Sequence, residues 1–225
     1  MFLFSFNIKD TMTSKNTPNK NIIERFFVLT IIILSLTFLT ILLGPYVRAE
    51  DAGLACPDWP LCHGYVIPPL DYQIYLEFIH RVVAGTLGIF FTIWFFWGIL
   101  KQPIRNRFLP YIILAAFVLT MQIYLGRETI TRQLNAYIVK FHLLNAIFFI
   151  SIIYYIFYQL FRLKFPLKKD NPYISNENVK SLKINLFILL LLLYLQSFLG
   201  GRVSANYVGL GLSRISRMLY RNHKK

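Results

Sequence analysis

The residues best suited to chemistry form a short cluster at positions 77–81, where Glu77, His80 and Arg81 occur together. On a helix, positions three and four residues apart share one face, so these three side chains would point in the same direction. Ionisable residues inside a membrane helix are costly and usually face a cavity or a cofactor. The alternative interpretation is a charge cluster that anchors the end of a helix at the membrane interface.

His142 is the natural partner of His80. Each of these histidines is followed four residues later by an alanine, Ala84 or Ala146, which leaves room for a flat ring against the helix. If both helices run inward from the outer face, the two imidazoles lie at the same depth. Helical bundles ligate heme iron with histidines placed in this way. A hydrogen-bonded structural histidine is the alternative at position 142.

The only two cysteines, Cys56 and Cys62, are separated by the five residues Pro-Asp-Trp-Pro-Leu. We expect this segment on the outer face, where thiols meet an oxidising compartment, and a turn at residues 57–60 would bring the sulfurs together. Three interpretations remain open: two free thiols, a structural disulfide, and a redox-active disulfide, since exposed and strained bridges are the labile kind. The neighbouring His63 is a weaker ligand candidate than the two helical histidines because it follows a loop cysteine.

Long apolar helices are needed to position these residues. Of the 225 residues, 56% are hydrophobic and 15% are charged, with a mean hydropathy of +0.52, whereas a soluble domain is about 25% charged. Crossing a hydrocarbon core takes about 20 helical residues, and several apolar stretches reach that length. The sequence therefore predicts an all-α, polytopic membrane bundle of about five transmembrane helices. The expected spans are residues 22–43, 77–100, 108–125, 138–161 and 182–199.

Most of the net charge of +14 lies in short segments between the apolar spans. By the positive-inside rule, the N-terminus and the loops after the second and fourth spans are cytoplasmic, and the cysteine segment lies outside. A nucleic-acid binder would carry its charge on a soluble, structured face, so no nucleic-acid partner is expected. We also expect no cleavable signal peptide, because the first apolar stretch is too long and no small-residue cleavage site follows it.

A weak internal repeat divides the chain. Six of twelve positions starting at Leu43 match those starting at Leu199, and each copy closes an apolar span. The fifth span would then open a second copy of the first unit, as in membrane proteins built from parallel repeats. The expected organisation is a cytoplasmic segment at 1–21, a four-helix heme-binding unit at 22–161, a cytoplasmic basic loop at 162–181, a fifth helix at 182–212 and a basic tail at 213–225.

Taken together, these motifs resemble the heme A synthase family. The resemblance covers most of residues 25–160, which are similar to the family's first four-helix unit, and residues 199–210 look like the opening of its second unit. The motifs that carry it are Leu43-Gly44, Val47-Arg48, Gly53-Leu54-Ala55-Cys56-Pro57-Asp58-Trp59-Pro60, Cys62-His63-Gly64, Glu77-x-x-His80-Arg81, Gln122, Leu125-Gly126, Thr129 and His142.

The resemblance implies a multi-pass oxidoreductase of the cell (inner) membrane. Such an enzyme oxidises the C8 methyl group of heme O to the formyl group of heme A, which supplies cytochrome oxidase. It also implies specific roles: His80 and His142 as ligands of the heme iron, Arg81 as a cofactor-binding residue, Glu77 as the essential carboxylate, and a disulfide between the two cysteines. The implied partners are heme O and membrane lipid, with a homo-oligomer, heme O synthase and the cytochrome oxidase assembly machinery as further candidates.

The chain also departs from the family pattern. Full-length members have eight spans and hold a heme b with a second histidine pair, which this sequence lacks. The alternative function is therefore a non-catalytic heme-binding membrane protein or an inactive truncated copy. A membrane thiol–quinone disulfide oxidoreductase is a third class. It is disfavoured because that chemistry normally relays electrons through two cysteine pairs.

Overall fold

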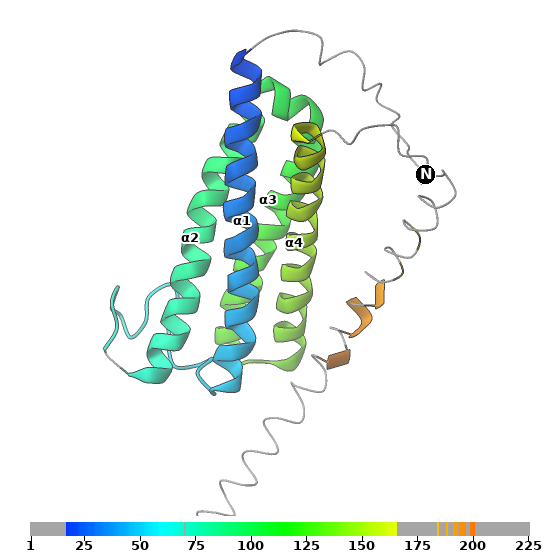
Figure 1. Ribbon diagram of the computed structural model, residues 1–225. Helices are drawn as coiled ribbons and strands as arrows, with labels where there is room; N and C mark the ends of the chain where they lie inside the picture. Colours follow the sequence, from blue (N-terminus) through cyan, green and yellow to red (C-terminus); the bar gives the residue numbers. More distant parts are fainter. Residues whose placement is uncertain are drawn as a thin grey trace, which may run out of the picture.

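The computed structural model describes residues 17–69 and 71–165, together with isolated helical positions between Ile184 and Gly200. The continuous part forms an up-and-down bundle of four helices (Figure 1). The helices are α1 (Thr17–Ala49), α2 (Tyr72–Leu100), α3 (Gln102–Thr131) and α4 (Ala136–Lys164). Each is long and apolar enough to span a membrane. The predicted all-α class and the multi-pass membrane character are therefore confirmed.

The helices pack around a square. Neighbours along the chain lie side by side, and α1 also packs against α4, which closes the bundle (Figure 1). The loop containing the two cysteines and the short α3–α4 loop lie at the same end, opposite the tight α2–α3 connection at Lys101. This arrangement places the outer ends of α2 and α4, which carry the two candidate histidines, at the end covered by the cysteine loop.

All four helices extend beyond the predicted spans. Helix α2 begins at Tyr72 rather than at residue 77, because the carboxylate of Asp71 accepts hydrogen bonds from the backbone of Gln73 and Ile74. Helix α3 begins directly after Lys101, six residues before the predicted span at 108–125, so Arg105 lies in its first turns. Hydropathy marks the part of a helix that crosses the hydrocarbon core, whereas capping residues determine where the helix begins.

Several sequence predictions fall outside the described residues. These are the cytoplasmic segment before residue 17, the basic loop from residue 166 onward, the basic tail at 213–225, and, apart from isolated helical positions, the fifth span at 182–199.

An aromatic cluster holds the bundle together at the end opposite the cysteine loop. Trp94 of α2 is fully buried and stacks on Phe26 of α1, with ring centroids 5.0 Å apart. Its indole Nε1 donates to the hydroxyl of Thr30, 2.9 Å away. Phe91, one turn earlier on α2, contacts Phe149 of α4 with ring centroids 5.6 Å apart. These contacts fix α2 against both α1 and α4 and so set the relative position of the two histidine-bearing helices.

Candidate functional site

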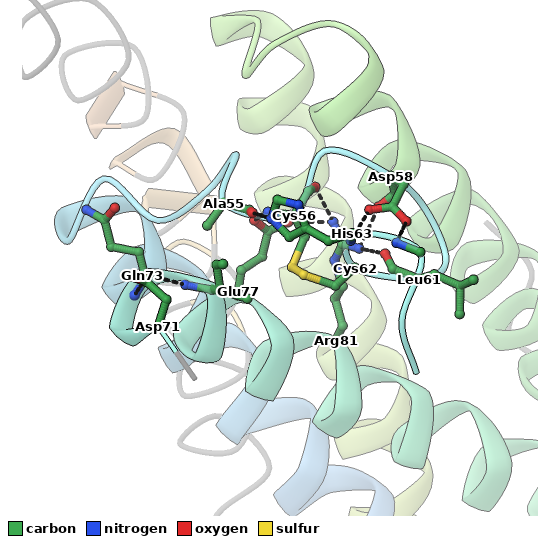
Figure 2. The surroundings of a disulfide bond; sticks show 12 residues. Ala55, Cys56, Asp58, Leu61, Cys62, His63, Asp71, Gln73, Glu77 and Arg81 are labelled. Atoms are coloured by element: carbon green, nitrogen blue, oxygen red, sulfur yellow. Dashed lines mark hydrogen bonds and ion pairs between the residues drawn. A yellow bond between two sulfur atoms is a disulfide. The ribbon is translucent and has the colours of Figure 1, made fainter. Parts of the chain in front are cut away.

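A disulfide joins Cys56 and Cys62 in the loop between α1 and α2 (Figure 2). The two cysteines are 0% and 1% exposed, respectively. A reactive bridge needs access to a partner thiol or cofactor, so this burial favours a structural disulfide over the redox-active alternative.

The side chain of Asp58 holds the same loop closed. Its carboxylate accepts the backbone N–H groups of Gly64, at 2.7 Å, and His63, at 2.6 Å. The hydrogen bond from Gly64 holds the pKa of the Asp58 carboxyl below its usual range. The ring of His63 pairs with the carbonyl of Ala55 at 2.8 Å, which ties this histidine to the loop. His63 therefore has a local structural partner, in keeping with its low ranking as a ligand.

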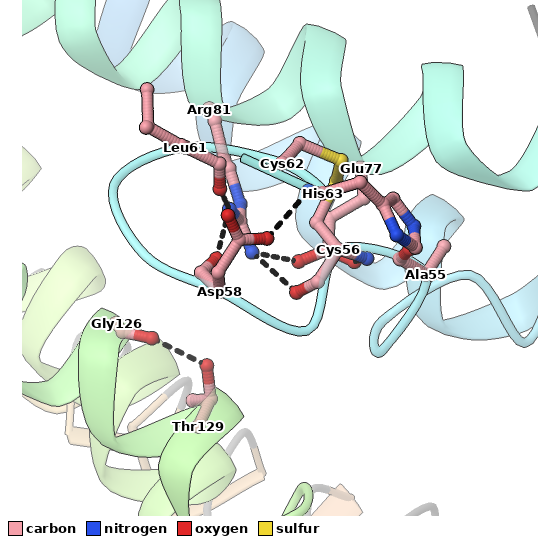
Figure 3. A network of polar contacts seen from close by, with 10 residues as sticks. All are labelled: Ala55, Cys56, Asp58, Leu61, Cys62, His63, Glu77, Arg81, Gly126 and Thr129. Carbon is pink, nitrogen blue, oxygen red and sulfur yellow. Dashed lines mark hydrogen bonds and ion pairs between the residues drawn. A yellow bond between two sulfur atoms is a disulfide. The ribbon is translucent and has the colours of Figure 1, made fainter. Parts of the chain in front are cut away.

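Glu77 and Arg81 clamp this loop onto α2 (Figures 2 and 3). Their side chains form an ion pair at 2.6 Å. The other carboxylate oxygen of Glu77 accepts the backbone N–H of Cys56 at 2.8 Å. Arg81 donates to the carbonyls of Cys56, Asp58 and Leu61 at 2.9, 2.7 and 2.5 Å. Apart from the ion pair that joins them, Glu77 and Arg81 direct their hydrogen bonds to the loop.

The two candidate histidines occupy equivalent positions in the bundle. His80 on α2 and His142 on α4 are both partly buried. Each imidazole lies against a glycine of the preceding helix. A Cβ atom added at Gly44 of α1 would be 3.6 Å from Nε2 of His80, and one added at Gly126 of α3 would be 3.1 Å from Cε1 of His142. These glycines let both rings lie close to the neighbouring helix.

Two amide side chains accompany His142. Asn145 donates from Nδ2 to the backbone carbonyl of Val118 at 2.9 Å and to Oε1 of Gln122 at 2.8 Å. Nε2 of Gln122 lies 3.4 Å from Nε2 of His142. Asn145 is not among the site residues predicted from the sequence. The available signal was a polar amide inside an apolar span, three residues after a candidate ligand.

Arg48 is the second residue that the sequence analysis left without a role. It lies on α1 one turn after Gly44, on the face that the glycine presents to His80. Its Nη1 is buried and has no hydrogen-bond partner in the described part of the protein. A buried, unpaired guanidinium nitrogen is costly, which favours an anionic partner at this position.

These features fit a heme. A flat ring needs two facing imidazoles and small neighbours, and its propionate groups need a cation. The structure supplies one histidine on α2 and one on α4, each against a glycine, and the unpartnered nitrogen of Arg48. No group of three or more His, Cys, Asp or Glu side chains that could hold a metal ion occurs among the described residues. Ligation of heme iron by His80 and His142 remains a prediction.

The two glycines provide a matched pair of variants. In Gly126→Ala the new methyl group would lie 3.1 Å from the His142 ring, closer than side chains normally pack, so the imidazole must shift by a few tenths of an ångström. In Gly44→Ala the corresponding distance is an ordinary contact. We expect Gly126→Ala to weaken heme binding by about tenfold or more, as disturbed orientation of a ligating histidine does, and Gly44→Ala to bind nearly normally. Optical titration of the purified protein with heme measures both. Equal effects of the two variants would contradict this account of the packing.

The chain is similar to proteins of one family over most of its length. The model for "Cytochrome oxidase assembly protein", COX15-CtaA, matches residues 27–74 and 71–220. The chain is 32% identical to the Heme A synthase of Shewanella oneidensis over 203 residues, which is 82% of this chain and 58% of that protein. It is 31% identical to the Heme A synthase of Macrococcus caseolyticus over 137 residues, covering 60% of this chain and 45% of that protein.

The chain therefore spans less than two thirds of the length of these relatives. The match includes the disulfide loop, its clamp and both histidines, because all of them lie between residues 27 and 220. On this similarity, the chain belongs to the COX15-CtaA family of cytochrome oxidase assembly proteins.

Proposed function

We propose that this protein oxidises the C8 methyl group of heme O to the formyl group of heme A, in the cell (inner) membrane. The observation that carries the proposal is that His80 on α2 and His142 on α4 each lie against a glycine of the preceding helix, at the end of the bundle covered by the disulfide loop. The similarity to proteins named Heme A synthase supplies the reaction. In this proposal the two imidazoles bind the heme iron from its two faces.

Arg48 is the proposed partner of a heme propionate. Its buried nitrogen has no partner among the described residues, and a guanidinium binds a carboxylate with strong, charge-assisted hydrogen bonds. The family resemblance implies a cofactor-binding role for Arg81. Because Arg81 donates to three loop carbonyls and to Glu77, we assign it the role of holding the loop, through which it acts on the heme site.

Glu77 is the proposed proton acceptor. Converting a methyl into a formyl group removes protons and electrons and adds one oxygen atom, which water supplies. An external electron acceptor takes the electrons. A carboxylate one helical turn from an iron ligand is placed to take up protons as the substrate is oxidised. The partly buried ion pair with Arg81 holds the Glu77 carboxylate in a fixed direction.

Conversion in cells tests the proposal. The protein would be expressed together with a heme O synthase, and the hemes would be extracted and separated by chromatography. We expect heme A to appear, and we expect it to disappear in the double variant His80→Ala/His142→Ala. Heme O alone, even when the remaining part of a full-length relative is supplied on a second chain, would contradict the proposal and favour a non-catalytic heme-binding protein.

The proposed partners follow from the same reaction. Heme O arrives from the enzyme that makes it, and heme A leaves toward the assembling oxidase, so we propose heme O synthase and the cytochrome oxidase assembly machinery as partners. Lipid surrounds the four apolar helices. A homo-oligomer would bring a second copy of the four-helix unit beside the first.

A further inference from the structure

We infer that Asn145 and Gln122 form a relay, anchored on the backbone carbonyl of Val118, that determines which ring nitrogen of His142 carries the proton. The inference deepens the proposed function and rests on the role proposed there for His142 as an iron ligand. Three hydrogen-bonding contacts between α3 and α4 carry it.

The orientation of the Asn145 amide is fixed first. A backbone carbonyl can only accept a hydrogen bond, so the atom of Asn145 that lies 2.9 Å from the oxygen of Val118 must be the amide nitrogen. This nitrogen is also 2.8 Å from the side chain of Gln122. Since the nitrogen can only donate, the facing atom of Gln122 must be its carbonyl oxygen.

The orientation of Gln122 then sets the tautomer of His142. With its oxygen turned toward Asn145, Gln122 presents its amide nitrogen to Nε2 of His142 at 3.4 Å. An amide nitrogen donates and does not accept, so Nε2 must be the ring nitrogen without a proton. A neutral imidazole carries one N–H, which therefore resides on Nδ1. Nδ1 has no hydrogen-bond partner within the described residues. Among the described contacts, only the one from Gln122 to Nε2 therefore selects the tautomer.

This tautomer is the one that a metal-binding histidine needs. Iron binds the unprotonated nitrogen of a neutral imidazole, and the hydrogen bond at the ring decides which nitrogen is free. The contact from Gln122 is at the long end of the hydrogen-bonding range. This contact can orient the imidazole before heme binds and break when the iron binds Nε2. Asn145 and Gln122 are thus positioning residues that act through His142.

Nuclear magnetic resonance on ¹⁵N-histidine-labelled full-length protein, without heme, tests the relay directly. The nitrogen shifts report which ring nitrogen is protonated, and the signals missing from a His142→Gln variant identify His142. We expect wild-type His142 to be protonated at Nδ1 and bare at Nε2. A wild-type ring protonated at Nε2 would overturn the inference, whatever the variants do.

Two variants extend the test. Asn145→Leu removes the anchor, so Gln122 can turn either way and the His142 signals should show both tautomers. If the bare-Nε2 form falls to about a tenth of the population, the apparent heme dissociation constant rises about tenfold. The matched control is Gln159→Leu, which removes another amide from α4, one that donates to Tyr155. It should keep the wild-type tautomer and affinity. An unchanged tautomer in Asn145→Leu would mean that Asn145 and Gln122 only hydrogen-bond to each other and do not set the tautomer of His142.

The relay and the proposed reaction can fail separately. The tautomer is read in protein without heme, whereas conversion of heme O is read from extracted hemes. A chain that makes heme A with His142 protonated at Nε2 would refute the relay alone. A chain with the expected tautomer but no conversion would refute the proposed reaction alone.

Discussion

Replacing either His80 or His142 with alanine is expected to abolish the low-spin Soret spectrum of the heme-loaded protein. A low-spin heme needs a strong ligand on each face of the iron, and each variant removes one of them. Heme affinity is expected to fall about 10- to 100-fold or more, because losing even a residue that only supports a ligand typically costs that much at a metal site. Absorption spectra of purified protein titrated with heme give both quantities.

The control for this experiment is His63→Ala. His63 lies in the disulfide loop with its ring paired to the carbonyl of Ala55, so its loss should leave the low-spin spectrum intact. Wild-type spectra from both helical histidine variants would show that the iron is held elsewhere. Loss of the spectrum in His63→Ala would assign a ligand to the loop.

Replacing Glu77 with glutamine is expected to preserve heme O binding while reducing its conversion by about 10²- to 10⁴-fold, the usual contribution of a positioned proton acceptor. Glutamine keeps the shape of the side chain and can still accept the backbone N–H of Cys56, but it loses the negative charge. A residue that acts only in the transition state lowers turnover with binding preserved. Heme extraction gives turnover, and optical titration gives binding.

The structure adds a second explanation that this experiment must separate. Glu77 also clamps the disulfide loop, so a variant could fail because the loop opens. Arg81→Gln is the comparison, because it removes the donors to the carbonyls of Asp58 and Leu61. We expect Arg81→Gln to make the disulfide easier to reduce and Glu77→Gln to leave its reduction rate nearly unchanged. Normal conversion by Glu77→Gln would show that Glu77 only anchors the loop.

Much of the fold could be predicted from the sequence because the membrane imposes a simple rule. A span must be apolar over its whole length, and the predicted first four spans each fall within one of the observed helices. The helix ends were predicted less well. The start of α2 depends on Asp71 and that of α4 on Asn135, whose side chain accepts the N–H of Tyr137. These capping bonds are local and polar, so hydropathy does not detect them.

The candidate site was predicted in part for the same reason. Residues 77–81 share a helical face, and periodicity alone places Glu77, His80 and Arg81 together. The partners of these residues come from segments distant in the sequence. Arg81 reaches loop carbonyls 20 to 25 residues away, and Asn145 on α4 contacts the neighbouring helix α3. Spacing within one helix contains no information about such contacts, so the clamp and the amide relay emerged only from the structure.

In the proposed arrangement, His80 and His142 bind one heme between α2 and α4. Electron paramagnetic resonance of the full chain loaded with ferric heme O, with and without ¹⁵N-histidine labelling, tests it most directly. We expect a low-spin signal with hyperfine coupling to two imidazole nitrogens in the wild-type chain, and loss of this low-spin signal in His142→Ala and in His80→Ala, each of which keeps a single imidazole ligand. A high-spin signal, or coupling to a single imidazole in the wild-type protein, would contradict it.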